Sequence, residues 1–458
     1  MTAAYELAKG GVAIDVYEAA PAVGGLAKTL ELWGQRVDLG PHRFFSVDKR
    51  VNQLWLEVVG RDYRMVDRLT RILYRGRLFH YPLKAIDALA KLGPGETARC
   101  VASYVKECLF PAQGHGSFED WVVRAFGRRL YEIFFKAYSE KLWGISCQDL
   151  DADFAAQRIK KLSMAEAMKA VVFGKGGDKH KTLVERFPYP LEGTGMVYGR
   201  MAEAVKARGQ RMYLATPVES VVVRGGRVTG LRLATGEFRP YSCIISTMPL
   251  TSLVQRLPEV PDDIRAKSEF LGFRNTVLVY LHTDGERLFP DNWLYVHSPE
   301  LKLGRLTNFR NWVPALYGDK KTTILCLEYW ASDRDGLWNC SDEELIGLAC
   351  REIRQIPLAA GARVLEGYVH RIKRCYPVYA RGYKEYLKPL EAYLSAIRGL
   401  VVIGRCGAFK YNNQDHSILM GILAARNILH GERNDVWAVN TDYETYQERA
   451  TISETGLK

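Results

Sequence analysis

The spacing of hydrophobic and polar residues changes along the chain, and each pattern predicts a different element. Residues 2–9 have a helical composition, and the Gly10-Gly11 pair that follows predicts a helix ending in a glycine cap. Residues 12–17 alternate in polarity and lead to the acidic Glu18, which predicts a strand. Helix, strand and terminal acid match the second half of a dinucleotide-binding βαβ unit. Taken alone, Glu18 fits a solvated acid at the end of a strand equally well.

The middle of the chain divides into a helical and a strand-rich part. Residues 86–187 are rich in Ala, Leu, Lys and Glu, which predicts a mostly helical insert. Strands then dominate, first as a β-meander with glycine turns and later as a second sheet. The expected strands cover residues 218–223, 227–233, 242–248, 276–281, 323–329 and 400–404. A last helix is expected at 420–427, directly after Asp415, His416 and Ser417, so that its N-terminal N–H groups point at a polar ligand.

Composition places the chain among ordinary folded proteins. It has 458 residues, of which 47% are hydrophobic and 25% charged, so disorder, collagen and coiled coil are excluded. A chain of this length is expected to form two or three domains. Apolar runs such as residues 399–404 are far shorter than the roughly 18 residues of a membrane span. We therefore expect no integral membrane segment.

Charge and cysteine usage narrow the classes of partner. The 64 Lys and Arg against 52 Asp and Glu give a net charge of +12, which suits an anionic ligand. The basic clusters at 158–161 and 179–181 are more often solvated faces, and no nucleic-acid-binding signature accompanies them, so we expect no nucleic acid. The nine scattered cysteines lack a Cys-x-x-Cys pair. They predict reduced thiols in a cytoplasmic protein without a metal site.

Three short motifs near the start of the chain carry a family resemblance. They are Glu18, the Gly24-Gly25 pair within residues 23–29, and the Asp-Leu-Gly sequence within residues 37–45. In this order they resemble the opening of the flavoprotein class that includes protoporphyrinogen oxidase, the amine oxidases and UDP-galactopyranose mutase. In that class the Gly-Gly pair lies against the pyrophosphate of FAD.

Later motifs are similar to the mutase branch of that class in its eukaryotic form. They occupy residues 117–121, 126–130, 141–144, 156–159, 292–296, 304–309, 311–314, 375–377 and 411–417. The Asn-Gln-Asp-His-Ser sequence in the last of them is the most specific. Together with the opening motifs they extend from about residue 18 to about residue 430, which is nearly the whole chain.

The resemblance implies an α/β architecture. A Rossmann-like FAD-binding domain is expected to carry a helical insert and a mixed β-sheet substrate domain. The expected division is 1–85, 190–255 and 395–430 for the FAD-binding domain, 86–189 for the insert, 256–394 for the β-rich substrate domain and 431–458 for a C-terminal tail. The first strand and the Gly-x-Gly-x-x-Gly turn of the family are missing from this chain, so we expect the natural coding sequence to extend upstream by that segment.

The resemblance also implies a reaction. It is a flavin-dependent interconversion of the pyranose and furanose rings of a nucleotide sugar, in which N5 of reduced FAD forms an adduct with the anomeric carbon and no net redox change occurs. The protein must hold the diphosphate while the sugar is detached. Arginines suit this task because their charge is permanent and their contacts bidentate, and tyrosines add neutral donors.

Individual residues take their expected roles from the matching motifs. His42, Arg158 and Arg305 are the expected catalytic residues. The expected substrate-binding residues are Trp293, Tyr295, Tyr376, Tyr411 and Asn413. The expected cofactor-binding residues are Glu18, Gly24, Gly25, Leu26, Gly40, His42, Arg405, Gln414, Asp415, His416 and Ser417. An arginine in a basic helix is usually a surface charge, and a tyrosine in a strand usually belongs to the core. The support for these roles therefore comes from the matches occurring together in the order of the family.

Two departures from the mutase pattern keep other functions open. Pro41 stands where the mutases have a second glycine before the histidine, and proline fixes φ by its ring. The spacing between Tyr411 and Asn413 is also shorter. Oxidases of the class do carry Gly-Pro at this point, so an FAD-dependent oxidoreductase of the amine oxidase or protoporphyrinogen oxidase type is the alternative. A truncated, non-catalytic binding protein that does not retain FAD is a third. A homo-oligomer is compatible with any of them.

Overall fold

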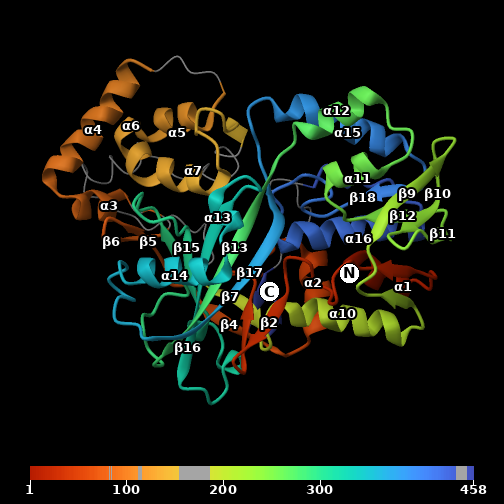
Figure 1. The fold of residues 1–458 in the computed structure, drawn as a ribbon, viewed down its shortest axis with the longest axis horizontal. Coiled ribbons are helices and arrows are strands. Elements are labelled where there is room, and N and C mark those ends of the chain that lie inside the picture. Colours follow the sequence, from red (N-terminus) through yellow and green to blue (C-terminus); the bar gives the residue numbers. More distant parts are fainter. Residues whose placement is uncertain (82, 84, 112–115, 154–185, 440–450) are drawn as a thin grey trace.

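A seven-stranded mixed sheet lies between a group of helices and a βα region in the computed structural model (Figure 1). The structure describes residues 1–458 except 82, 84, 112–115, 154–185 and 440–450. The order of the sheet is β17-β13-β16-β15-β14-β5-β6, with β14 and β5 parallel and the other pairs antiparallel. Its strands are β5 (Thr70–Tyr74), β6 (Arg77–His80), β13 (Phe273–Asp284), β14 (Trp293–Val296), β15 (Arg305–Asn308), β16 (Thr322–Ala331) and β17 (Val364–Pro377).

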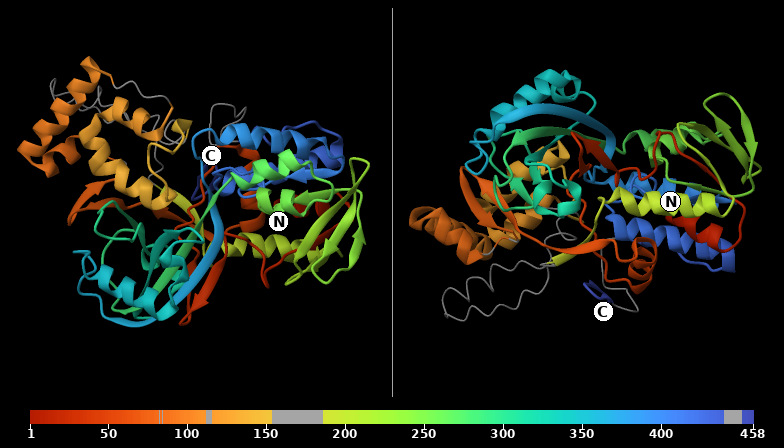
Figure 2. Two further views of the ribbon diagram at one scale, coloured as in Figure 1. Left: turned by 45° about the horizontal axis from the view of Figure 1, so that its top comes forward. Right: turned by 90° about the horizontal axis from the view of Figure 1, so that it is seen from below.

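The βα region contains two short parallel strand pairs. Strand β1 (Asp15–Tyr17) pairs with β8 (Arg211–Tyr213), and β12 (Ile244–Ser246) pairs with β18 (Leu400–Val402). Helix α1 (Thr2–Lys9) packs against α10 (Gly195–Ala207) and α16 (Gln414–His430), as Figure 2 shows. Their buried side chains form one hydrophobic cluster with residues of both strand pairs. Around them lie α2 (Lys49–Val59), β9 (Val218–Arg224), β10 (Arg227–Leu233), β11 (Phe238–Pro240), α11 (Leu250–Arg256), α12 (Asp262–Glu269) and α15 (Tyr383–Ala396).

The expected helical insert is present in the part that the structure describes. Its elements are α3 (Ala85–Leu92), α4 (Pro94–Leu109), α5 (Phe118–Phe126), α6 (Arg128–Tyr131), the π-helical turn η1 (Glu132–Lys136) and α7 (Ala137–Trp143). Ser117 and Asp120 form a reciprocal capping box that starts α5. The end of α7 is tied to the sheet by Lys141, whose ammonium donates to the carbonyl oxygens of Val296, Ser298 and Leu303. The insert is thereby held against the strands that face it.

The buried Asp38, at the end of β3 (Gln35–Asp38), joins elements from distant parts of the chain. Its carboxylate accepts hydrogen bonds from the Thr29 and Tyr189 hydroxyls at 2.6 Å each and from the backbone N–H of Thr194 at 3.0 Å. Its backbone carbonyl accepts from the Tyr280 hydroxyl. These partners belong to β2 (Thr29–Leu32), β7 (Arg186–Pro190), the start of α10 and β13. Burial raises the pKa of Asp38, although all of these side-chain donors act to lower it.

Most of the expected elements are confirmed, and the start of the last helix needs correction. Strands 218–223, 227–233, 276–281 and 323–329 all form, as does the helix at 2–9. The last helix begins at Gln414, so that Asp415 and His416 lie in its first turn rather than before it. Residues 70–80 belong to the seven-stranded sheet because β5 pairs with β14, whereas the expected division assigned them to the FAD-binding domain. Periodicity identifies a strand but not its distant partner.

Smaller elements complete the described chain. They are β4 (Tyr63–Asp67), which pairs with β7, the 3-10 turns η2 (Phe309–Asn311) and η3 (Pro314–Leu316), α13 (Gly336–Asn339), α14 (Asp342–Ile353), and a C-terminal hairpin of β19 (Ile452–Ser453) and β20 (Gly456–Leu457). Among the described helices, none combines the length and the apolar character that crossing a bilayer requires.

Candidate functional site

The loop that leaves β3 packs directly on two charged side chains of the central sheet. Gly40 has a φ of 96°, a conformation that favours glycine. A Cβ at this position would lie 3.5 Å from Oε2 of Glu328 and 3.7 Å from Nη2 of Arg305. The loop therefore brings the following Pro41 and His42 next to this pair.

His42 is held from its backbone while its ring stays buried. Its carbonyl oxygen accepts from the Thr194 hydroxyl at 3.1 Å and from the Gln414 side-chain amide at 3.5 Å. The ring nitrogen Nδ1 is buried and has no hydrogen-bond partner among the described residues. Burial, followed by the charges of Arg305 and Arg405, lowers the pKa of His42 to about 3. The imidazole is therefore neutral near pH 7.

Arg305 and Glu328 form a buried ion pair across two neighbouring strands. They are direct partners in the β15–β16 register. The Nε atom of Arg305 donates to Oε2 of Glu328 at 2.8 Å, and Nη2 donates to the same oxygen. The two side chains are 17% and 3% exposed. Burial is the largest single influence and acts to lower the pKa of Arg305, but the charge of Glu328 and the neighbouring tyrosines together hold that pKa well above its usual range.

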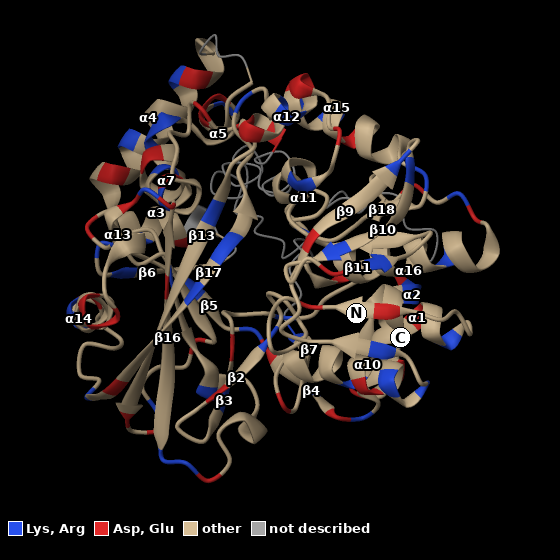
Figure 3. Cartoon of the chain, turned by 45° about the vertical axis from the view of Figure 1, so that its right-hand side comes forward, with Lys and Arg blue, Asp and Glu red and all other residues tan. Residues whose placement is uncertain are grey.

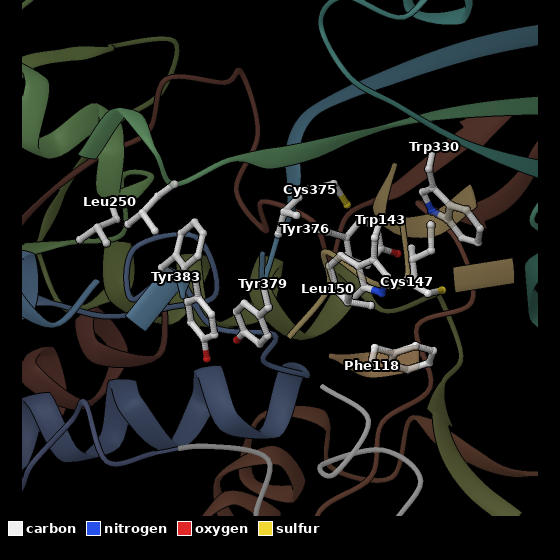
Figure 4. Packing of buried hydrophobic residues seen from close by; sticks show 14 of the residues in the cluster. Phe118, Trp143, Cys147, Leu150, Leu250, Trp330, Cys375, Tyr376, Tyr379 and Tyr383 are labelled. Atoms are coloured by element: carbon white, nitrogen blue, oxygen red, sulfur yellow. The ribbon is translucent and has the colours of Figure 1, made fainter. Parts of the chain in front are cut away.

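Four tyrosines surround this ion pair. Tyr376 and Tyr411 stack with their ring centroids 5.6 Å apart, and Tyr295 meets Tyr138 edge to face at 5.8 Å. Tyr138 comes from α7 of the helical insert, so the site combines side chains of the insert and the sheet. Burial raises the pKa of Tyr138 and of Tyr376 well above the usual range, which keeps both hydroxyls protonated. Figure 4 shows Tyr376 beside Trp143, the residue that ends α7.

Arg405 adds a second buried guanidinium to the site. Its Cζ atom lies 4.5 Å from the ring centroid of Tyr376 and 4.5 Å from that of Tyr411, beside the stacked pair. Nη1 donates to the carbonyl oxygen of Asn412 at 3.2 Å. Nε and Nη2 are buried without a hydrogen-bond partner within the described part of the chain. Buried guanidinium donors that lack a protein acceptor call for a ligand that accepts hydrogen bonds and carries negative charge.

A second set of residues suits a dinucleotide cofactor. Glu18 follows β1 and is only half-buried, and the Gly24-Gly25 pair after it has φ values of 109° and 56°. A Cβ at Gly25 would meet no described atom within 4 Å, so its backbone is open to close approach by a ligand. On the other side of the region, α16 begins at Gln414 beside the His42 loop, and its first N–H groups favour an anionic or polar group. Acid, paired glycines and helix N-terminus fit an FAD.

The structure brings together some of the residues that the sequence motifs selected. His42, Arg305, Arg405, Tyr376 and Tyr411 lie around one centre, with Tyr295 next to Tyr138. Arg158 lies outside the described residues. Trp293 is buried, with its ring edge to face with Tyr295 at 6.4 Å and 5.8 Å from the ring of Trp312. Leu26 packs on the edge of the large cluster that also holds Trp143. Asn413 is exposed, whereas its neighbour Asn412 is buried.

Sequence reasoning missed two members of the site. Glu328 lies within Thr322–Ala331, a strand whose other central residues are apolar and buried. A lone carboxylate in such a strand requires a cationic partner, and this signal could have identified it. Tyr138 gave no comparable signal, because aromatic residues are common in helices that build a core.

In the view of Figure 3, the basic residues do not form one separate patch. Figure 3 shows Lys and Arg interleaved with Asp and Glu over the described helices and loops. Within the molecule, however, Arg305 pairs with Glu328, and Arg405 lies over the rings of Tyr376 and Tyr411. The net charge of +12 thus says less about the ligand than these two arginines do.

Comparison with known families agrees with this geometry. The family described as flavin containing amine oxidoreductase matches residues 1–429. Two curated phytoene desaturases (neurosporene-forming) are similar over part of the chain, one from Cereibacter sphaeroides at 24% identity and one from Rhodobacter capsulatus at 25%. Each match covers 56% of this chain and 52% of the relative, so the chain spans about half the length of these curated relatives.

Solved structures extend the likeness to nearly the whole chain. A reduced UDP-galactopyranose mutase has a TM-score of 0.85 at 21% identity, covering 96% of this chain and 94% of that one. A putrescine oxidase bound to putrescine has a TM-score of 0.63 at 15% identity, covering 93% and 96%. At these identities the likeness establishes the fold, and the expected mixed α/β flavoprotein architecture is confirmed.

Proposed function

Because the chain belongs to the family of flavin-containing amine oxidoreductases and its cofactor is FAD, we propose that it is an FAD-dependent nucleotide-sugar mutase. The observation that carries the proposal is the pair of buried arginines beside the His42 loop. A diphosphate satisfies the unpartnered Nε and Nη2 of Arg405, and no described residue accepts from Nη1 of Arg305. The fold shared with a UDP-galactopyranose mutase supports the same choice.

The charge of the site also argues against an amine as substrate. An ammonium group placed among Arg305 and Arg405 is repelled by both, and within the described part of the site the compensating charge is that of Glu328, which Arg305 already uses. The putrescine oxidase therefore shares the fold with this chain, while the charges here suit an anion. A nucleoside diphosphate has the charge and the acceptor oxygens that the two guanidiniums need.

In this proposal each group of the site has a defined task. Reduced flavin, when bound, supplies the nucleophile for the anomeric carbon. Arg305 and Arg405 retain the diphosphate while it is detached from the sugar, so that it stays in place for the return step. Tyr295, Tyr376 and Tyr411 line the same space and exclude water with their rings. The neutral His42 adds no third positive charge, and its buried Nδ1 is available to a ligand.

The decisive experiment is to incubate dithionite-reduced, FAD-loaded protein with UDP-galactopyranose and to look for the furanose by chromatography. Interconversion should require reduced flavin and consume no oxidant. Arg305→Lys keeps the charge and loses the planar fork, so nucleotide-sugar binding should weaken by about 1.5–3 kcal/mol while FAD content is unchanged. Arg310→Lys is the matched control, because Arg310 binds backbone carbonyls outside the site. Equal binding by Arg305→Lys and wild type would remove the main support for the proposal.

An FAD-dependent oxidoreductase is the second candidate, favoured by the Gly40-Pro41 sequence. Proline fixes φ at this point, so the loop lacks the rotational freedom that a second glycine gives. Steady peroxide release coupled to product, with no interconversion of a nucleotide sugar by the reduced protein, would establish this candidate instead. The arginine pair restricts its substrate to a neutral or anionic molecule.

A further inference from the structure

The buried carboxylate of Glu328 divides its two oxygens between different groups. Oε2 accepts both contacts from Arg305, while Oε1 accepts from the indole N–H of Trp330 at 2.9 Å and from the Tyr376 hydroxyl at 3.1 Å. Glu328 is only 2% exposed, so no bulk water competes for these oxygens. One carboxylate therefore orders three side chains of the site at once.

The contacts on Oε2 decide which part of Arg305 is available. With Nε and Nη2 engaged, the guanidinium plane is fixed, and the remaining nitrogen Nη1 has no acceptor within the described chain. Arginine without such a partner rotates about several bonds, and ordering it costs conformational entropy when a ligand binds. The backbone of Gly40 closes the other side of the pair, so the fork has little room to turn.

The contact on Oε1 decides the state of Tyr376. A tyrosine hydroxyl has one proton to donate, and here Glu328 accepts it. A phosphate oxygen next to this hydroxyl also needs a donor. Tyr376 can serve the phosphate only by turning its proton away from Glu328, and Oε1 then keeps the indole N–H of Trp330 as its donor.

We propose that Glu328 is a positioning residue for the diphosphate. It holds the Arg305 guanidinium in place, and in the absence of nucleotide it accepts the hydrogen bond of the Tyr376 hydroxyl. When the nucleotide binds, this hydroxyl donates to the diphosphate instead. This inference rests on the proposed nucleotide-sugar function. Glu328 touches neither sugar nor diphosphate in this assignment and acts through Arg305 and Tyr376. No covalent bond forms or breaks in this exchange, because only the acceptor of the Tyr376 hydrogen bond changes.

The test measures UDP binding to the FAD-loaded protein by calorimetry. Glu328→Gln removes the charge and one acceptor oxygen, so the fork and the Tyr376 hydroxyl lose their common partner and the Kd for UDP should rise by about tenfold or more. Glu352→Gln is the matched control, because Glu352 is a buried carboxylate of the same domain that binds the backbone N–H groups of Lys302 and Leu303. It should lower stability and leave the Kd for UDP unchanged.

A double variant separates a positioning role from a merely structural one. If Glu328 acts through Arg305, the Kd increase of Glu328→Gln combined with Arg305→Lys should be clearly smaller than the product of the two single increases. Flavin absorbance should stay that of wild type in all variants. A double variant whose Kd increase equals the product of the two single increases would overturn the positioning role. An unchanged Kd for UDP in Glu328→Gln would overturn it as well.

Failure of the inference and failure of the proposed function give different results. Wild-type protein that does not bind UDP overturns both. Wild-type protein that binds UDP while Glu328→Gln binds it equally well overturns the inference alone. If Glu328→Gln does not fold, Glu328→Asp keeps the charge but is too short to hold Arg305 and Tyr376 together, so its Kd should still rise severalfold, and an unchanged Kd would count against the inference.

Discussion

Two buried carboxylates lie close to one short loop, one at its start and one on the sheet against which it packs, and they have different partners. Asp38, at the start of the loop, is fully buried, and its partners among the described residues are neutral, namely the hydroxyls of Thr29 and Tyr189 and the N–H of Thr194. Glu328, against which Gly40 packs, is paired with the guanidinium of Arg305. Both are acids in the interior, but only one of them has a countercharge.

The difference in partners separates a structural role from a functional one. Without a countercharge, burial raises the pKa of Asp38, and its hydrogen bonds serve to join β2, β7 and α10 behind the loop. Glu328 neutralises Arg305 and at the same time leaves one guanidinium nitrogen for a ligand. The buried Asp38 holds the segments behind the loop together, whereas the buried Glu328 orients the guanidinium that the proposed function assigns to the diphosphate.

Removing Arg305 should have the largest effect on stability, because it abolishes the difference between the two carboxylates. In Arg305→Ala the carboxylate of Glu328 keeps the neutral donors Trp330 and Tyr376 among its described partners. Like Asp38, it is then a buried acid without a described countercharge. Loss of one partner of a buried pair should lower the free energy of unfolding by about 3–5 kcal/mol. Urea unfolding followed by far-UV circular dichroism measures this loss. The control is Arg363→Ala, which breaks a solvent-exposed pair with Asp284 and should change stability little.

Equal stability of Arg305→Ala and wild type would contradict the comparison, because the buried carboxylate of Glu328 would then need no countercharge.

Replacing Asp38 should give the next largest effect. In Asp38→Asn an amide N–H replaces one acceptor and faces groups that also donate, so stability should fall by about 1–3 kcal/mol. The pH profile should change as well. Because the folded pKa of Asp38 is raised above 3.8, its contribution to stability is complete below pH 3.8 and is lost as the pH rises through the folded pKa. Melting temperatures across this range should show that loss in wild type and not in Asp38→Asn.

The local sequence pattern was sufficient to predict most of the strands and helices and to select several residues of the candidate site by their motifs. The alternation in 218–233 and the apolar strands at 276–281 and 323–329 are properties of neighbouring residues, and they were identified correctly. His42, Arg305, Tyr376 and Tyr411 were selected by motif, and the structure places them around one centre. Their individual roles remain predictions.

Contacts between distant segments could not be derived in the same way. Glu328 is recognisable only once β15 and β16 are known to pair in the register that sets it opposite Arg305. The same holds for β5, whose strand pattern does not say that it joins β14 rather than the dinucleotide-binding part. Such pairings depend on long-range packing, which a period of two residues does not encode.

The smallest expected effect concerns His42, which lies on the arginine side of the loop. Its pKa is lowered to about 3 by burial and by Arg305 and Arg405, in contrast to the raised pKa of Asp38 at the other end of the same loop. A lowered folded pKa means that stability is lost only as the pH falls from 6.5 toward that value. Between about pH 5 and 8, where an ordinary histidine titrates, His42 should therefore stay neutral, and UDP affinity should show no step of its own. Calorimetric titrations of wild type and His42→Gln, whose side chain never ionises, should give parallel pH profiles across this interval. An inflection near the usual histidine pKa in wild type that disappears in His42→Gln would mean that His42 takes up a proton beside two arginines, which only a countercharge closer than Glu328 would allow.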